Sequence, residues 1–273
     1  MSNLETRTHL LAGLPPAPPE EALLPQIQQQ VAASRRKLVV IDDDPTGVQT
    51  VYDVRLLLDW DAAALREAFA DHAPLFFLLT NSRSQPEERA VAMNQQIAEL
   101  LREVAGDRGF AVASRSDSTL RGHYPAEVDA LSEALGPVDG HLIVPAFLDG
   151  GRVTINNTHY VATPNATADR LMPADQTPFA KDHAFGYSTA FLPAWVEERS
   201  GGRWRDADVA MLDLGLIRAG GPDAVAERLQ HASGGQPIIV NAASYGDLAV
   251  VALGVLWAEA AGKRFIYRTA ADF

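Results

Sequence analysis

Residues 38–47 read LVVIDDDPTG, and this stretch decides the fold. Its four leading apolar residues predict a short strand that is buried on both faces, as the strands of parallel sheets are. Three carboxylates and a Pro-Thr-Gly sequence that is typical of turns follow at once. We therefore expect a central strand that ends near residue 42 and carries acidic side chains at its carboxyl end.

The same kind of apolar run recurs along the chain, at Leu75–Leu79, Phe110–Ala113, Leu142–Val144, Val209–Leu212, Pro237–Val240 and Arg264–Tyr267. Helical patterns separate most of these runs. The clearest extends from Pro86 to about Ala105, a second begins at Pro125, and a third, apolar nearly all round, spans residues 247–261. This alternation predicts an α/β fold with a Rossmann-like open, mainly parallel sheet and helices on both faces. Ligands of such folds bind outside the carboxyl ends of the strands.

The chain divides into an arm and one domain. Residues 1–34 are rich in proline and glutamine and predict an N-terminal arm, in which residues 20–34 have the pattern of a helix. Residues 35–273 hold the repeated pattern and predict the α/β domain. The chain has 273 residues, 47% of them hydrophobic and 21% charged, which is the composition of a globular protein with a sizeable core.

Charge and composition narrow the range of partners. A formal net charge of −12 argues against a broad surface for nucleic acid or anionic membranes. Because there is no cysteine, disulfides, thiolate metal sites and a cysteine nucleophile are excluded. The N-terminus lacks the pattern of a secretory signal, and no segment has the roughly 18 apolar residues of a membrane span. We expect a cytoplasmic protein whose partner is a small molecule.

Polar residues gather where the predicted strands end. Asp42–Asp44 follow the first strand, and such a cluster can hold Mg²⁺, accept a proton from a substrate hydroxyl or bind sugar hydroxyls. Residues 80–84 follow the second strand and contain Arg83, directly before a helix whose N-terminus offers free N–H groups to an anion.

The next two strand ends are rich in arginine. Residues 114–123, SRSDSTLRGH, contain Arg115 and Arg121, and Arg152 follows two glycines after the fourth strand. Arginine binds a carboxylate through two parallel N–H contacts, which lysine cannot reproduce. His159 lies a little further on and either donates to a substrate oxygen or has a structural role. Acids at one strand end and arginines at three others predict a site for a small, anionic, hydroxylated molecule.

These segments resemble the four-carbon acid sugar kinase family, which includes threonate, erythronate and 3-oxo-tetronate kinases. The resemblance rests on the blocks IDDDPTGVQTVYDV, LLTNSRS, SRSDSTLRGHYP and PAF–GGR–HYV and extends from about residue 10 to residue 273. It implies an N-terminal domain that binds the acid sugar and belongs with a C-terminal ATP-binding domain, in cis or in trans. ATP and Mg²⁺ would be bound mainly by that second domain, so we expect this half to be inactive alone. A homo-oligomer is compatible with the resemblance.

The resemblance also implies roles for individual residues. Arg83, Arg115, Arg121 and Arg152 are candidates to hold the substrate carboxylate. The catalytic candidates are Asp43, Asp44 and Asp117, which would bind the hydroxyls and draw off a proton during ATP-dependent phosphorylation. No metal ligand is assigned to this chain. The other expected substrate contacts are Thr46, Gly47, Asn81, Ser82, Ser118, Thr119, Gly122 and His159. Two departures from the family are Asn156-Asn157, where relatives often have glycine, and Lys181, where arginine is common.

Two alternatives remain open at this point. The run before Asp42 and Asp44 also resembles the first motif of haloacid dehalogenase-type phosphatases, in which Asp42 would be the nucleophile. Against it, the chain has only Lys37, Lys181 and Lys263 as lysines and lacks a late acidic pair. The other alternative is a non-catalytic acid-sugar sensor or one subunit of a split kinase, because the chain contains neither G-x-x-x-x-G-K-[ST] nor G-x-G-x-x-G.

Overall fold

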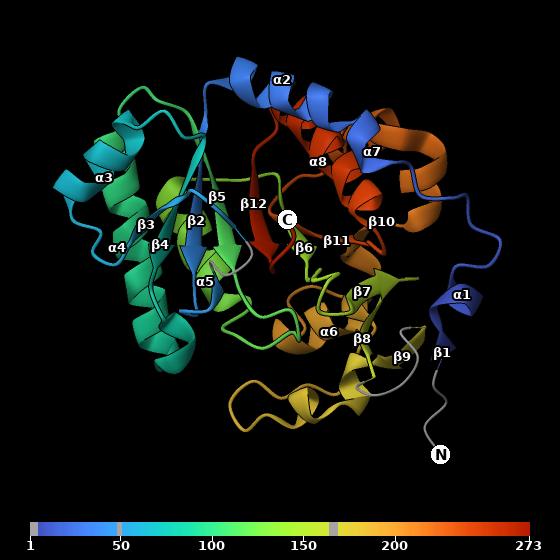
Figure 1. Ribbon diagram of the computed structural model, residues 1–273. Helices are drawn as coiled ribbons and strands as arrows, with labels where there is room; N and C mark the ends of the chain where they lie inside the picture. Colours follow the sequence, from blue (N-terminus) through green and yellow to red (C-terminus); the bar gives the residue numbers. More distant parts are fainter. Residues whose placement is uncertain (1–4, 48–50, 164–168) are drawn as a thin grey trace.

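The computed structural model describes residues 5–47, 51–163 and 169–273 (Figure 1). Residues 1–4 of the predicted arm and residues 48–50, which belong to the block IDDDPTGVQTVYDV, lie outside the described residues. Across the part that is described, the strands form one sheet of eight strands and one of four.

The eight-stranded sheet is parallel throughout, with the strand order β10-β11-β6-β12-β5-β2-β4-β3. Each run predicted from the sequence forms one of these strands, and the three-residue β3 was not predicted. The strands are β2 (Lys37–Asp42), β3 (Arg55–Leu57), β4 (Leu75–Leu79), β5 (Phe110–Arg115), β6 (Gly140–Val144), β10 (Ala210–Leu212), β11 (Gln236–Val240) and β12 (Phe265–Thr269).

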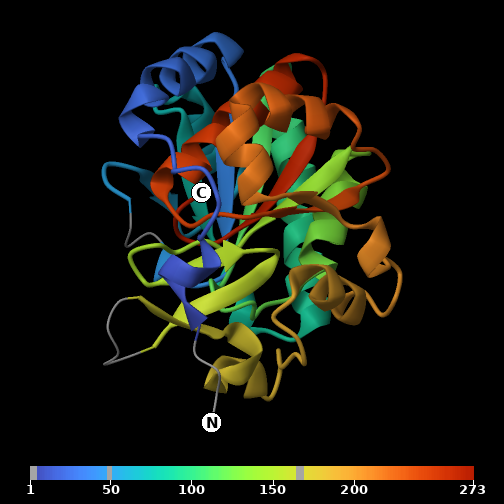
Figure 2. The ribbon, with the colours of Figure 1, turned by 90° about the vertical axis from the view of Figure 1, so that its right-hand side faces the viewer.

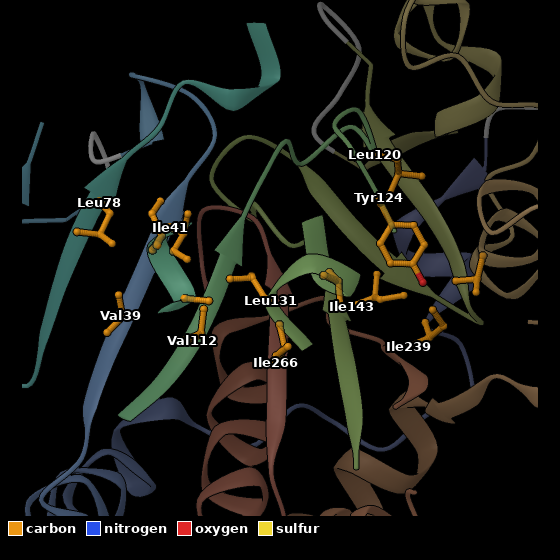
Figure 3. Packing of buried hydrophobic residues seen from close by; sticks show 14 of the residues in the cluster. Val39, Ile41, Leu78, Val112, Leu120, Tyr124, Leu131, Ile143, Ile239 and Ile266 are labelled. Atoms are coloured by element: carbon orange, nitrogen blue, oxygen red, sulfur yellow. The ribbon is translucent and has the colours of Figure 1, made fainter. Parts of the chain in front are cut away.

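Helices cover both faces of this sheet, because alternate residues of each buried strand point to opposite sides. Val39 and Ile41 of β2 pack in a core with residues of α3, α4, α5 and α6, whereas Val40 packs in a second core with α7 and α8. Figure 3 shows part of the first core, with Val39 and Ile41 beside Val112 of β5. The predicted Rossmann-like α/β fold is therefore confirmed. The helices are α1 (Arg7–Leu10), α2 (Leu24–Ser34), α3 (Ala62–Ala70), α4 (Glu87–Ala105), α5 (Ala126–Leu135), α6 (Leu192–Arg199), α7 (Gly221–Gln230) and α8 (Tyr245–Ala260), with short turns at η1 (Glu20–Ala22), η3 (Ser82–Ser84), η4 (Ala174–Gln176), η5 (Pro178–Lys181), η6 (Asp206–Asp208) and the π-helical η7 (Leu216–Gly220).

The strand order reverses beside β2. From β2 the chain proceeds to β3 and β4 on one side of that strand and then crosses to β5 on the other side. A reversal of this kind opens a crevice outside the carboxyl ends of the two neighbouring strands. The segments that follow β2 and β5 therefore lie next to each other, although about 70 residues separate them in the sequence.

The second sheet is antiparallel, was not predicted, and has the order β1-β9-β8-β7, with β1 (Glu5–Thr6), β7 (Arg152–Ile155), β8 (Thr158–Ala162) and β9 (Arg170–Pro173). It lies beyond the arrowheads of the parallel strands in Figures 1 and 2, and two backbone hydrogen bonds join Thr154 to Ala242 just after β11. The turn between β7 and β8 places Asn156 and Asn157 at φ 50° and 60°. Asparagine tolerates this conformation, so the turn forms without a glycine at either position.

The N-terminal segment runs along the domain. The helix expected within residues 20–34 is present as α2, and further upstream the backbone carbonyl of Pro15 accepts a hydrogen bond of 3.1 Å from Arg218. Across the three described ranges, no helix is both long enough and apolar enough to cross a membrane.

Candidate functional site

Asp42 and Arg115 meet at the carboxyl ends of β2 and β5. They are direct neighbours in the strand register, and Arg115 Nη1 lies 3.1 Å from Asp42 Oδ2. The two side chains are 1% and 10% exposed, respectively. A Cβ atom at Gly47 would come within 1.6 Å of Asp42 Oδ2, so the turn after β2 closes directly on this ion pair. Gly47 therefore makes room for the pair, which is a packing role.

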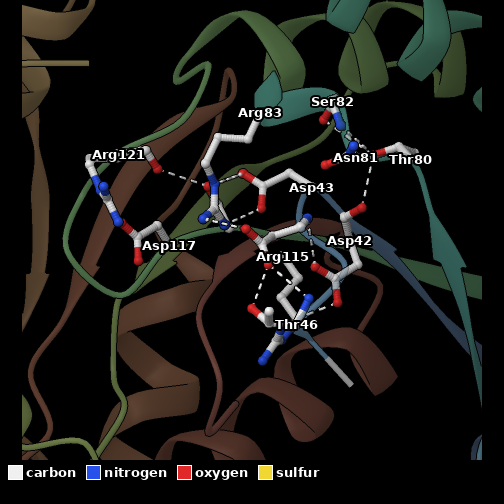
Figure 4. A network of polar contacts seen from close by, with 12 residues as sticks. Asp42, Asp43, Thr46, Thr80, Asn81, Ser82, Arg83, Arg115, Asp117 and Arg121 are labelled. Atoms are coloured by element: carbon white, nitrogen blue, oxygen red, sulfur yellow. Dashed lines mark hydrogen bonds and ion pairs between the residues drawn. The ribbon is translucent and has the colours of Figure 1, made fainter. Parts of the chain in front are cut away.

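Arg83 joins the other two aspartates (Figure 4). Its Nε donates to Asp43 Oδ2 at 3.2 Å, its Nη2 donates to Asp43 Oδ1, and its Nη1 donates to Asp44 Oδ2 at 3.0 Å. The Asp43 side chain is 3% exposed, whereas that of Asp44 is 27% exposed. Asp43 is thus a buried residue that holds Arg83 in place, and Asp44 is the member of the acidic triplet that a ligand can reach.

The loop after β5 supplies a second accessible acid. Arg121 Nε donates to Asp117 Oδ2 at 2.6 Å, and the Thr119 hydroxyl donates to the same oxygen. The guanidinium of Arg121 also lies 5.1 Å from the centre of the Phe179 ring and 3.5 Å from a carboxylate oxygen of Asp182. Asp117 is 13% exposed and Arg121 29%. This pair forms the other edge of the candidate site.

A buried layer of polar residues lies beneath these loops. Arg268 of β12 donates to Ser116 Oγ at 2.9 Å and to Glu127 Oε2 of α5 at 2.7 Å. Ser116 Oγ in turn lies 2.6 Å from Asp43 Oδ2. Sequence reasoning assigned no role to these three residues, because no local pattern links the last strand to the loop after β5. Ser116 lies inside the block SRSDSTLRGHYP, which was the one signal for it.

Burial sets the protonation of the acidic triplet. It raises the pKa of Asp42 to about 6, against the opposing charge of Arg115. It also raises the pKa of Asp43, and the charge and hydrogen bonds of Arg83 oppose that rise. For Asp44 burial acts in the same direction, but hydrogen bonds from Thr46 and the charge of Arg83 bring its pKa below the ordinary value. The accessible acid is therefore the one that stays ionised most readily.

Arg152 begins β7 and differs from the other three candidate arginines. Its Nη1 donates to Gly150 O at 2.8 Å, and its guanidinium lies 5.4 Å from the centre of the Phe147 ring. Its Nε is buried without a hydrogen-bond partner, and among the described residues no carboxylate lies within ion-pair distance. Burial lowers the pKa of Arg152, and the nearby charges of Asp117 and Arg121 act on that pKa in opposite directions, Asp117 raising it and Arg121 lowering it. A cation whose donors are incompletely satisfied thus stands beside the accessible pair.

His159 was expected to contact the substrate, and this expectation is corrected by its burial. The side chain has no exposed surface. Its Nε2 lies 2.7 Å from Ser118 O and its Nδ1 lies 3.0 Å from Thr154 Oγ1, so both ring nitrogens have partners inside the protein. Burial lowers the pKa of His159 to about 4, which keeps the ring neutral. We therefore assign His159 to the structure that holds the loop after β5 against the small sheet.

The remaining candidate residues lie in the same loops, and most of them make hydrogen bonds that hold these loops in place. Ser82 is buried and donates to Glu127 Oε1 at 2.6 Å, and Asn81 takes a left-handed conformation with φ 52°. The amide and hydroxyl of Thr46 donate to Asp44, Ser118 contributes its carbonyl to His159, and Gly122 packs against Ser116. The structure therefore brings all the predicted loops together, while leaving few of their side chains free for a ligand.

The cavities of the domain differ in character. One of about 20 Å³ touches Asp117, Arg121 and Arg268, which is room for about one water molecule. A larger one of about 420 Å³ lies between α2, α8 and the sheet and is lined mainly by apolar side chains such as Ile27 and Leu248. The cations at its wall already have partners in the protein: Arg36 pairs with Glu259, and Lys37 donates to the backbone carbonyls of Asp71 and Ala73. The polar site is consequently open to solvent at Asp44 and Arg121 rather than enclosed.

The residues present do not fit a Mg²⁺ ion by themselves. In the described ranges, no three acidic or histidine side chains are grouped closely enough to hold a metal ion. Asp42 and Asp43 are buried and paired with Arg115 and Arg83, so their oxygens face cations that the protein already supplies. Arg83 and Arg115, rather than a metal ion, therefore neutralise the buried aspartates Asp43 and Asp42.

This geometry defines an α/β domain with a cluster of charged residues at its topological switch point. Residues 38–273 match the family model of the sugar-binding N-terminal domain, and the chain belongs to this family. It is 28% identical over 179 residues to the D-erythronate kinase of Heliobacterium modesticaldum, an alignment that covers 65% of this chain and 37% of that enzyme. The predicted relationship to the N-terminal half of four-carbon acid sugar kinases is confirmed.

Solved structures share the fold. A DUF1537 protein of Bordetella bronchiseptica, a domain-swapped dimer with bound citrate, superposes with a TM-score of 0.65 at 23% identity and covers 87% of this chain and 55% of its own. A Haemophilus influenzae protein superposes with a TM-score of 0.58 at 18% identity, covering 86% of this chain and 53% of its own. This chain therefore spans about half the length of these structures and little more than a third of the kinase.

The phosphatase alternative is wrong. The family match covers residues 38–273, including the Asp42–Asp44 motif on which that alternative rested. In addition, the Asp42 carboxylate is 1% exposed and paired with Arg115, so it is not placed to attack a phosphorus atom.

Proposed function

We propose that this chain is the substrate-binding part of an ATP-dependent kinase that phosphorylates a hydroxyl of a four-carbon sugar acid. Its family and its similarity to a D-erythronate kinase support this substrate class. The observation that carries the proposal is Arg152, a half-buried cation without a carboxylate partner among the described residues, within electrostatic range of the accessible acid Asp117. A sugar acid brings one carboxylate for the cation and several hydroxyls for the acids.

The four arginines named from the sequence thereby take different roles. Arg83, Arg115 and Arg121 each neutralise an aspartate of the protein. Arg152 is the one of the four that can accept a carboxylate from outside without breaking an internal ion pair. We assign it the substrate carboxylate, which it would bind as a charge-assisted contact.

The acids are likewise divided. Because Asp43 is buried, we assign the hydroxyl contacts and the acceptance of the proton to Asp44 or Asp117, whose side chains are partly exposed at the site. ATP and Mg²⁺ belong in the proposal to a second domain, supplied in cis or in trans. Phosphoryl transfer depends on positioning and charge stabilisation, so this chain's contribution is to orient the attacking hydroxyl.

The assembly and location are part of the proposal. Because the Bordetella relative is a domain-swapped dimer, we propose that this chain also forms a homo-oligomer. The structure of that relative contains bound citrate, which is a carboxylate ligand as a sugar acid is. We place the protein in the cytoplasm and propose that without the second domain it binds the sugar acid but does not phosphorylate it. This binding activity is what a sensor or a split-kinase subunit would also require.

Calorimetry tests the proposal. The chain should bind D-erythronate about 10–100-fold more tightly than erythritol, its neutral polyol counterpart, since a charged hydrogen bond contributes about 1.5–3 kcal/mol. Arg152→Met should remove most of that preference, whereas Arg66→Met on the exposed surface of α3 should preserve it. Equal affinity of the wild type for both compounds, or an unchanged preference in Arg152→Met, would contradict the proposal.

A further inference from the structure

Arg268 is the most deeply buried cation near the site, and it touches none of the accessible acids. Its side chain is 6% exposed, on the central strand β12 between β5 and β6. The guanidinium donates to three oxygens: Ser114 Oγ at 2.7 Å, Glu127 Oε2 at 2.7 Å and Ser116 Oγ at 2.9 Å. A buried arginine costs free energy unless such partners satisfy it, and here they come from β5, α5 and the loop after β5.

The contact with Ser116 fixes the direction of one proton. Arginine has donors and no acceptor, so it occupies a lone pair of Ser116 Oγ and leaves that hydroxyl a single proton to donate. Two acceptors lie within reach, Asp43 Oδ2 at 2.6 Å and Arg121 O at 3.0 Å. The nearer acceptor is a carboxylate, and charge-assisted bonds are the shorter and stronger ones. Ser116 therefore donates to Asp43.

Asp43 connects Ser116 to the partly exposed residues Arg83 and Asp44. Both of its oxygens accept from Arg83, and Arg83 also donates to Asp44, the accessible acid of the triplet. A continuous chain of hydrogen bonds thus runs from Glu127 to Asp44, through Arg268, Ser116, Asp43 and Arg83. Glu127 also accepts from Ser82, the residue directly before Arg83, so the same buried pair holds the loop after β4 from below.

We propose that Arg268 is a positioning residue that orients Asp44 and Arg83 through Ser116 and Asp43 without contacting the ligand. This inference rests on the proposed binding of a sugar acid at Asp44 and Arg152. It gives the last strand of the domain a part in ligand binding that the loops alone do not reveal.

Two serines provide a matched test. Ser114 and Ser116 are both buried and both accept from Arg268, but of the two it is Ser116 that lies beside Asp43. Ser116→Ala should weaken D-erythronate binding about tenfold or more, and Ser114→Ala should change it less than about twofold. Arg268→Lys keeps the charge but not the forked geometry, so it should lower affinity as Ser116→Ala does, and the double variant should add little. Equal losses in Ser114→Ala and Ser116→Ala, as a purely structural role predicts, would overturn the inference.

A second measurement needs no ligand. The Nε–Hε resonance of Arg83 in ¹H–¹⁵N spectra should shift in Ser116→Ala and stay in place in Ser114→Ala, because the first variant frees Asp43 and the second does not. An unmoved resonance in Ser116→Ala refutes the inference even where no sugar acid binds. Conversely, the wild type could fail to bind D-erythronate while the Arg83 resonance shifts in Ser116→Ala. That result would refute the proposed substrate and support the positioning role.

Discussion

Replacing Gly122 by alanine tests how tightly the loop after β5 closes on the buried layer. Gly122 has φ 126°, and a Cβ there would lie 2.4 Å from Ser116 Oγ, 2.8 Å from Arg268 Nη2 and 3.1 Å from Asp43 Oδ2. Ordinary contacts begin near 3.4 Å, so the serine would have to retreat by about 1 Å within a closed network. The backbone conformation costs about 1–2 kcal/mol and the overpacking about 1–3 kcal/mol, which together predict a loss of about 2–5 kcal/mol.

Gly262 supplies the control. It also has a positive φ, 99°, but no atom of the described residues lies within 4 Å of its Cβ position. Gly262→Ala should therefore cost the backbone contribution alone, about 1–2 kcal/mol. Urea unfolding followed by circular dichroism gives both free energies of unfolding, provided that the two variants share the wild-type m-value. If Gly122→Ala were no less stable than Gly262→Ala, the tight packing around Ser116 would be refuted.

Two further predictions concern buried charges. His159 and His141 are fully buried and neutral, with the pKa of each lowered by burial to about 4. The unfolded chain binds their protons more tightly, so the histidine contribution to stability should be constant above about pH 6.5 and fall between there and pH 4, by roughly 3 kcal/mol per histidine. Asp42, with its raised pKa, contributes with the opposite sign over the same range, so the measurement is the difference between wild type and His159→Gln in thermal melts. That difference should shrink as the pH falls from 6.5 to 4, and a difference that does not change with pH would contradict the assigned neutral state. Arg218 binds both carboxylate oxygens of Asp247, at 2.8 and 3.0 Å, with side chains 5% and 0% exposed. Arg218→Met should lower the free energy of unfolding measured in urea by about 3–5 kcal/mol, because it leaves the buried Asp247 carboxylate without a partner. The double variant Arg218→Met with Asp247→Leu should lower it much less. Equal losses in the two variants would show that the unpaired charge of Asp247 is not the cause of the destabilisation.

The sequence predicted where the site lies better than what its side chains do. Apolar runs mark the strands of a parallel sheet, and polar residues after Ile41, Leu79 and Ala113 mark the edge at which their loops meet. Those patterns are local, so they report position along a strand. They do not report that Asp42 pairs with Arg115 or that Asp43 pairs with Arg83, because each pair joins two strand ends that are distant in sequence.

Burial was the other property beyond reach of the sequence. Asp43 and Asp44 are adjacent and chemically identical, yet one is enclosed by Ser116 and Arg83 and the other faces solvent. The small antiparallel sheet was missed because its strands are short and its partner β1 comes from the N-terminal arm. That sheet encloses His159, which is why a histidine with a plausible substrate contact turned out to be structural.

The position of β12 has a consequence for the order in which the molecule can be completed. Among the eight strands this one comes last in sequence, yet it sits in the middle of the sheet, hydrogen-bonded to β5 on one side and β6 on the other. Until residues 265–269 emerge from the ribosome, the growing sheet consists of two separate pieces with unpaired edges, and Glu127 has no cation to meet. The proposed binding site should therefore form late and in one step. Insertion of β12 both joins the two pieces of the sheet and brings the Arg268 guanidinium to Glu127 and Ser116.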